Sequence, residues 1–109
     1  MAKPNMKLDK TQASTDNYVE VATVEAPHIY SNVNFQFVEQ NVNAVLYKID
    51  ASQVNEAGTF VTLVSDGAVA KGGVEYEMLY NEGWLFFKLS VKSAVAGAHG
   101  NLRSLVTFY

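Results

Sequence analysis

The stretch YNEGWLFFKLSV, residues 80–91, carries the strongest strand signal of the chain. The turn signal NEG leads directly into a run of large apolar and aromatic side chains. Successive side chains of a strand point to opposite faces, so Leu85, Phe87, Leu89 and Val91 share one face. Because this set is uniformly apolar, we predict that it faces the core of a β-sheet protein.

The same period of two recurs on both sides of this stretch, with turn residues between the segments. One of these turn signals, SDG at residues 65–67, predicts a hairpin turn in which the glycine takes a positive φ. No segment has a helical period. The spacing therefore predicts an all-β protein, an antiparallel two-sheet sandwich of about seven strands. The segments expected as strands are 17–25, 32–40, 41–50, 59–64, 74–80, 84–91 and 102–109.

The order of these segments resembles that of an immunoglobulin-like domain. The resemblance rests on YNEGWLFFKLSV, where a turn leads into an aromatic-rich strand as at one corner of that fold. The chain departs from the family in two ways: it has no cysteine pair, and its tryptophan lies in the sixth expected strand. The resemblance implies only the architecture, and a jelly roll or small barrel is the alternative.

Composition bounds the class of protein. The chain has 109 residues, of which 49% are hydrophobic and 17% charged, so we expect one folded domain. The absence of cysteine excludes disulfides, cysteine-ligated zinc and thiol catalysis. With a net charge of −3 and no basic patch, the chain is not expected to bind nucleic acid. No stretch is long and apolar enough to predict a membrane span.

Residues 1–16 are polar and are predicted to form an N-terminal arm ahead of a sandwich domain at residues 17–109. We expect the arm to lie on its own domain or on a neighbouring subunit. Its lysines Lys3, Lys7 and Lys10 are then partner contacts, with nucleic-acid binding as the minor alternative. No apolar run follows the positive charges, so we expect synthesis in the cytoplasm without a signal peptide.

No pattern typical of an enzyme emerges. His28 and His99 lie in expected loops without a neighbouring carboxylate, and neither has metal-ligand spacing. Glu75 and Glu77 share one face of an expected strand, where we interpret them as outward-facing charges that keep the strand soluble. An acid–base pair or a calcium site is the alternative. We therefore predict no enzymatic activity, no cofactor and no metal.

The aromatic strand also predicts a contact surface. Trp84, Phe86 and Lys88 lie opposite the apolar stripe, so they point out of the sandwich. Paired exposed aromatics seldom face bare water. Contact with another protein chain and cover by the chain's own arm or a loop are both expected explanations, and sugar stacking is the third.

The C-terminal segment LRSLVTFY has apolar residues on both faces, which favours burial between subunits and a homo-oligomer or larger assembly. A compact, cysteine-free all-β chain with a polar arm resembles the small structural proteins of tailed-phage virions, of the capsid-decoration or head-fibre type. The resemblance implies a non-enzymatic virion protein that binds neighbouring subunits through its arm and an apolar sheet face. The alternative function is a carbohydrate-binding or adhesive module.

Overall fold

Regular structure in the computed structural model consists of strands alone, over the residues that it describes, 4–27, 30–81 and 83–109. The short alternating segments expected from the sequence account for seven of the eight strands. The strands are β1 (Asn5–Ala13), β2 (Val19–Glu25), β3 (Asn32–Glu39), β4 (Val45–Ser52), β5 (Val61–Val69), β6 (Val74–Tyr80), β7 (Phe86–Ser93) and β8 (Asn101–Phe108).

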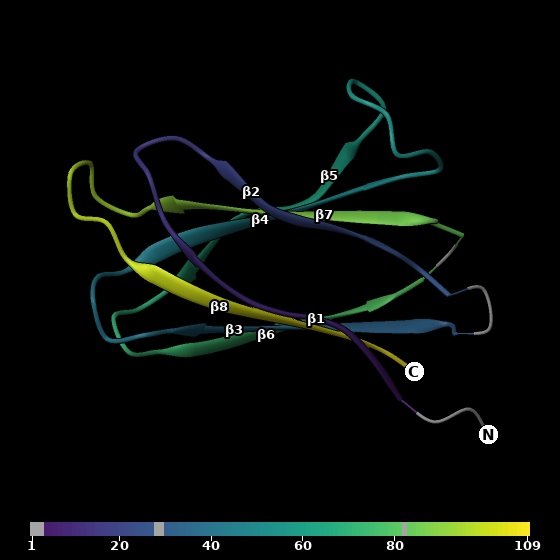
Figure 1. The fold of residues 1–109 in the computed structure, drawn as a ribbon, viewed down its shortest axis with the longest axis horizontal. Coiled ribbons are helices and arrows are strands. Elements are labelled where there is room, and N and C mark those ends of the chain that lie inside the picture. Colours follow the sequence, from purple (N-terminus) through teal and green to yellow (C-terminus); the bar gives the residue numbers. More distant parts are fainter. Residues whose placement is uncertain (1–3, 28–29, 82) are drawn as a thin grey trace.

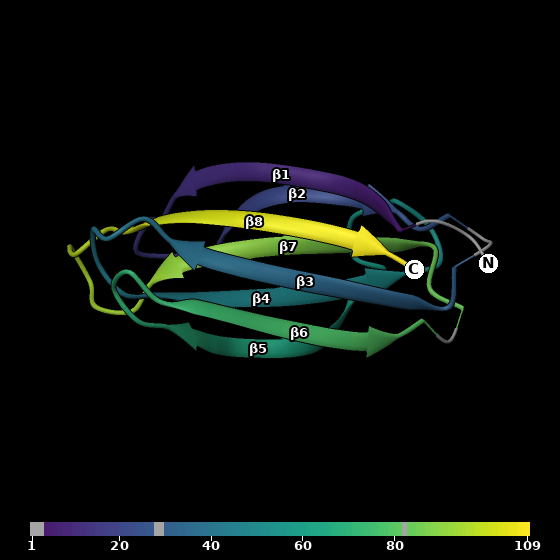
Figure 2. The same ribbon diagram turned by 90° about the horizontal axis from the view of Figure 1, so that it is seen from below.

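The strands form two antiparallel four-stranded sheets that pack face to face (Figure 1). The first sheet has the order β1-β8-β3-β6 and the second has the order β2-β7-β4-β5. Figure 2 looks onto the outer face of the first sheet, with β1 along one edge and β6 along the other. The prediction of an all-β two-sheet sandwich is confirmed, with eight strands in place of about seven.

Most connections cross from one sheet to the other. Only β4 and β5 are consecutive in the chain and neighbours in one sheet. An immunoglobulin domain instead keeps several consecutive strands together in one sheet. Eight strands in two sheets connected in this way form a jelly roll, which is the second of the two expected architectures.

The eighth strand lies in the segment that was predicted to be an arm. Asn5–Ala13 pairs antiparallel with β8, from Asn5 opposite Phe108 to Ala13 opposite Asn101. Polar side chains are tolerated there because β1 is an edge strand, and the inward Leu8 packs against the core. This part of the segment is thus a strand of the sandwich, which differs from the prediction of a separate arm.

The core fills the space between the sheets with aromatic and branched side chains. Phe87 packs edge-on against Phe35, with ring centroids 5.6 Å apart, and lies 6.1 Å from the ring of Phe108. Leu89 and Val91 are fully buried beside it, which confirms the predicted inner face of this strand. Leu85 was expected on the same face, but it precedes β7 and is 44% exposed.

The prediction of a hairpin turn at residues 65–67 is wrong, because SDG lies inside β5. Asp66, and not the glycine, takes the positive φ of 55°. The pairing with β4 shifts register nearby, after Tyr47. A Cβ on Gly67 would lie 2.2 Å from the Tyr47 ring, so the glycine lets that ring pack against the backbone while its other face stacks on Phe37 at 4.0 Å. The glycine serves close packing and not a turn.

Candidate functional site: the outer face of the first sheet

The aromatic residues predicted as a contact surface are largely covered by the chain itself. The ammonium of Lys88 lies 4.5 Å from the ring centroid of Phe60, which precedes β5. Phe86 is half-buried, and Trp84, which precedes β7, packs partly against the core. The intramolecular cover considered from the sequence is therefore present around Lys88, while a partner contact at these three residues stays a prediction.

Two of the three predicted lysine contacts, Lys7 and Lys10, lie on β1. Lys3 lies outside the described residues. Lys7 is exposed, while Lys10 donates a hydrogen bond to the carbonyl of Val21 at 2.8 Å and so ties β1 to β2. A partner contact through these lysines is not tested by this geometry.

The outer face of the second sheet is charged, and several of its charges are paired with one another. The Tyr18 ring lies between two ammonium groups, those of Lys48 at 5.0 Å and Lys92 at 4.8 Å from its centroid. The Tyr18 hydroxyl donates to Asp66, and Thr62 donates to the buried Asp50 at 2.6 Å. Charges that are already paired and partly desolvated offer little to a partner.

The outer face of the first sheet is different, beginning with β6. Its outward row is apolar and exposed: the exposed fractions are 54% for Val74, 65% for Tyr76, 61% for Met78 and 70% for Tyr80. These side chains alternate along a single edge strand, so they form a continuous row. A row of four large exposed side chains is unusual on a surface that faces only water.

The two glutamates of this strand face the other way from the prediction. Glu75 is opposite Phe37 and Glu77 is opposite Phe35 in the ladder, and both phenylalanines point into the core. The carboxylates are tolerated because β6 borders the open side of the sandwich, and Glu77 accepts a hydrogen bond from Tyr47 Oη at 2.7 Å. Burial and then this hydrogen bond raise the pKa of Tyr47, which keeps the phenol neutral.

Uncharged polar side chains continue the face across the sheet. The β3 residues Asn32, Asn34 and Gln36 lie opposite Tyr80, Met78 and Tyr76, respectively. On their other side they lie opposite Tyr109, Thr107 and Leu105. We call these residues the amide–tyrosine face, and its members are Asn32, Asn34, Gln36, Val74, Tyr76, Met78, Tyr80, Leu105, Thr107 and Tyr109.

Two features make this face suited to binding. None of its side chains is charged. Beside the face, Arg103 and Asp9 form an ion pair in which Nη2 lies 2.7 Å from Oδ2, so their charges offset each other. The side-chain oxygen of Asn34 is shielded from solvent and has no hydrogen-bond partner in the described part of the chain. An unsatisfied buried acceptor costs roughly 1–3 kcal/mol, so a donor from a partner would be favourable there.

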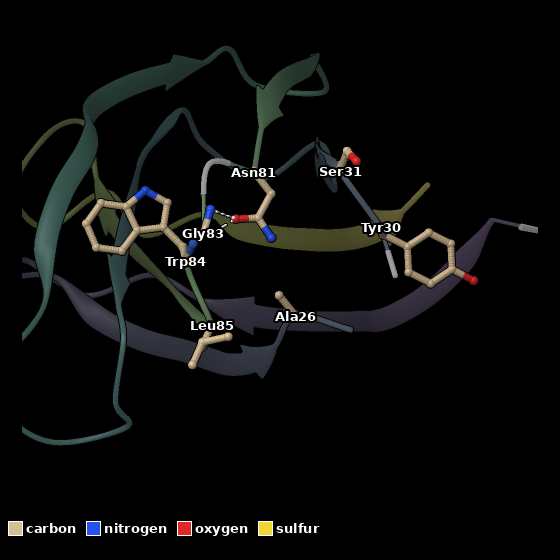
Figure 3. A pocket seen from close by; sticks show the side chains of 7 residues that line it. All are labelled: Ala26, Tyr30, Ser31, Asn81, Gly83, Trp84 and Leu85. Atoms are coloured by element: carbon tan, nitrogen blue, oxygen red, sulfur yellow. Dashed lines mark hydrogen bonds between the residues drawn. The ribbon is translucent and has the colours of Figure 1, made fainter. Parts of the chain in front are cut away.

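A hollow of about 250 Å³ opens at one end of the sandwich. Its lining includes Ala26, Ser31 and Asn81, and Asn81 Oδ1 accepts hydrogen bonds from the backbone N–H groups of Gly83 and Trp84. In Figure 3 the rings of Trp84 and Tyr30 point in opposite directions, so they do not form the parallel walls of a stacking site. The hollow is a small feature next to the amide–tyrosine face, since Asn81 follows Tyr80 directly.

Of the two histidines, the structure describes His99, whose contacts do not form a catalytic relay. His28 lies outside the described residues. His99 Nδ1 lies 2.8 Å from Ser93 Oγ and 3.9 Å from Asp16, so serine and carboxylate approach the same ring nitrogen. A serine–histidine–aspartate relay needs them on opposite nitrogens. Within residues 4–27, 30–81 and 83–109, no three histidine, aspartate or glutamate side chains are grouped to hold a metal.

Over the same ranges, no helix has the length and hydropathy needed to cross a membrane.

Comparison with known proteins gives similarity at the level of the fold. No family model and no curated protein sequence matches the chain. Among solved structures, the prophage-derived protein YomS from SPBc2 is similar at a TM-score of 0.61 and 14% identity, over 98% of this chain and 96% of that one. The K3 adhesin domain of Lys-gingipain from Porphyromonas gingivalis has a TM-score of 0.61 and 18% identity, over 93% and 74%.

A structure of infectious bursal disease virus, strain Gx, is also similar. Its TM-score is 0.55 at 14% identity, and the match covers 97% of this chain but 31% of that longer one. At these identities the similarity establishes a shared sandwich fold.

Proposed function

We propose that the chain is a non-enzymatic structural subunit that binds neighbouring protein subunits through its amide–tyrosine face. The observation that carries the proposal is an uncharged face with exposed tyrosines and a methionine on a rigid four-stranded sheet. Protein interfaces are depleted of charge at their centre and enriched in tyrosine and methionine. The opposite outer face, with its paired charges, stays in solvent.

A virion is the assembly that we propose for such a subunit, as a capsid-decoration or head-fibre protein made in the cytoplasm. The similarity in fold to a prophage-derived protein and to a structure of infectious bursal disease virus supports this setting. In such an assembly a small sandwich reinforces a lattice by repeated weak contacts, so a flat apolar face is more useful than a deep pocket.

A carbohydrate-binding or adhesive module is the second candidate. The specific observation in its favour is the stripe of Asn32, Asn34 and Gln36 between tyrosines, because sugars stack on aromatic rings and hydrogen-bond to amides. Met78 and Leu105 on the same face offer a sugar no hydrogen bond, which favours a protein partner. A glycan screen that showed binding by the monomer would favour the second candidate.

We expect the double substitution Tyr76→Ser and Tyr80→Ser to weaken association by about tenfold or more, because central tyrosines often contribute over 1 kcal/mol each. Both side chains are mostly exposed, so the free energy of unfolding should change by less than about 1 kcal/mol. Sedimentation velocity measures the first effect and urea unfolding the second. The matched control is Val95→Ser, which removes a 65% exposed side chain from a distant loop. Equal association of the wild type, the double variant and Val95→Ser would contradict the proposal.

The substitution Trp84→Ala tests whether the partner binds the amide–tyrosine face or the surface predicted from the sequence at Trp84, Phe86 and Lys88. Because Trp84 packs partly against the core, we expect a loss of about 2 kcal/mol in the free energy of unfolding and unchanged association of the folded chain. Thermal melting and sedimentation of the same variant report the two effects. Weakened association with an unchanged melting temperature would instead place the contact at Trp84.

A further inference from the structure

The four edge strands of the sandwich differ in how they are protected. Natural edge strands are blunted by bulges, lysines, prolines or inward-pointing charges, which prevent pairing with another chain. Ladders that include β1, β2 and β5 shift register, between Met6 and Leu8, between Glu20 and Ala22, and after Tyr47. In contrast β6 pairs with β3 over seven consecutive residues without a shift, and it contains no lysine or proline. The backbone of this edge is therefore regular, and its inward charges are Glu75 and Glu77, of which Glu77 is held by Tyr47 Oη at 2.7 Å.

The direction of the free hydrogen-bonding groups of β6 follows from the bonds at its two ends. Asn81 N–H donates to the Ser31 carbonyl at 2.6 Å, and Glu39 N–H donates to the Gly73 carbonyl at 3.0 Å. Hydrogen bonds alternate along an antiparallel ladder, so residues 75, 77 and 79 also bond toward β3. The backbone groups of Tyr76 and Met78, like those of the other outward residues, then point away from the sheet.

We propose that β6 pairs antiparallel with β6 of a second copy of this chain, with Met78 on the two-fold axis. The inference rests on the proposed function, because it names the partner that the outward row of β6 meets. Pairing adds a strand to a sheet edge through backbone hydrogen bonds, and identical strands can do so symmetrically.

Overlap and charge together select this register, because an axis at Val74 or Tyr80 would pair β6 with its copy only at that end residue. An axis at Tyr76 would place Glu75 opposite Glu77 of the second copy, and an axis at Glu77 would place two copies of that carboxylate opposite each other. Like charges directly opposite destabilise a ladder. With the axis at Met78, Glu77 lies opposite Leu79 and Tyr76 lies opposite Tyr80, so tyrosines meet across the new edge.

The pairing would join the two first sheets, four strands from each copy, into one continuous sheet. The amide–tyrosine faces would then lie side by side on the same surface. A second copy satisfies the free edge and extends the uncharged face at once, which is why it is the favoured occupant of this edge.

The test uses single cysteines, because the chain has none of its own. Residues on the axis of a hydrogen-bonded pair have Cα atoms about 5.5 Å apart, which suits a disulfide. We expect Met78→Cys to form a disulfide-linked dimer under mild oxidation. Tyr76→Cys and Tyr80→Cys should not form homodimers, because each residue lies about 13 Å along the strand from its own copy. Mixed in equal amounts, these two variants should crosslink to each other.

Val95→Cys, on an exposed loop, gives the background rate of crosslinking by collision. If Tyr76→Cys formed disulfide-linked homodimers as fast as Met78→Cys or faster, the proposed register would be overturned. Crosslinking of Met78→Cys without the mixed pair would mean that the faces meet flat, which overturns edge pairing. No crosslink at all, in a protein that still associates in a Tyr76- and Tyr80-dependent way, would overturn this inference and leave the proposed function standing.

Discussion

Replacing Phe87 with alanine is expected to lower the free energy of unfolding by about 3–5 kcal/mol, the range measured for buried aromatics. The side chain is 1% exposed and packs between the two sheets, against Phe35 from β3 and Phe108 from β8. Its removal leaves a cavity that three strands of a rigid sandwich cannot close. Urea unfolding followed by tryptophan fluorescence measures the loss.

The control for this substitution is the neighbouring residue. Phe86→Ala removes the same side chain from the opposite face of β7, where the ring is half-buried, so we expect a cost of about 1 kcal/mol. If Phe87→Ala costs less than about 1 kcal/mol, the assignment of the two faces of this strand is reversed.

Glu39→Gln is expected to cost about 3 kcal/mol or more at neutral pH. This carboxylate is 2% exposed and accepts hydrogen bonds from the backbone N–H groups of Val42, Asn43, Gly72 and Asn101, at 2.8–3.4 Å. It thereby holds together three connections at one end of the sandwich. Glutamine has the same shape as glutamate, but its NH₂ group replaces one of the two acceptor oxygens. Some of the buried backbone N–H groups are then left without an acceptor.

The pH dependence of stability follows from the same group. Burial acts to raise the pKa of Glu39, but the hydrogen bonds from Asn101, Gly72, Val42 and Asn43 outweigh it and hold the pKa below the ordinary 4.5. A lowered pKa in the folded state stabilises the protein above the unfolded-state value, and this stabilisation is lost as pH falls through the folded-state value.

The stability difference between wild type and Glu39→Gln should therefore shrink between pH 7 and pH 3. Urea unfolding at the two pH values measures it, with the exposed Glu56→Gln as the control. A difference that is equal at both values would show that the carboxylate charge does not contribute to the stability.

The inner face of β7 could be predicted from the sequence because one alternating set, Phe87, Leu89 and Val91, is uniformly apolar. The faces of β6 could not be predicted from the sequence. There the alternation sets Val74, Tyr76, Met78 and Tyr80 against two glutamates, and burial of the apolar set is the ordinary expectation. The structure reverses it because β6 is an edge strand, and its inward carboxylates reach Tyr47 and solvent at the open side.

The same limit applies to β1 and to the turn signal in β5. The segment NMKLDKTQA has no apolar alternation, and it becomes a strand because β8 offers it a long partner far away in the sequence. The residues SDG are typical of a turn, but the ring of Tyr47 requires a glycine at that point of the ladder. Position in a sheet is a tertiary property, and local pattern does not contain it.

The amide–tyrosine face was missed for this reason. Its residues come from β3, β6 and β8, and no single segment predicts a binding surface. The segment NFQF predicts an ordinary amphipathic strand, and LVTFY predicts a buried one. Only the register brings Asn34 between Met78 and Thr107. A signal that was available is the run of uncharged outward residues in β3, where Asn32, Asn34 and Gln36 replace the lysines and glutamates usual on a solvated face.

Oxidative footprinting by hydroxyl radicals, at low and high protein concentration, locates the association surface in the unsubstituted chain, since methionine, tyrosine and tryptophan are among the most reactive side chains. We expect association to protect Tyr76, Met78 and Tyr80 from oxidation, while the reactivity of Trp84 and Tyr18 stays the same. Protection of Trp84 in the associated state, with Tyr76, Met78 and Tyr80 as reactive as in the monomer, would contradict this expectation.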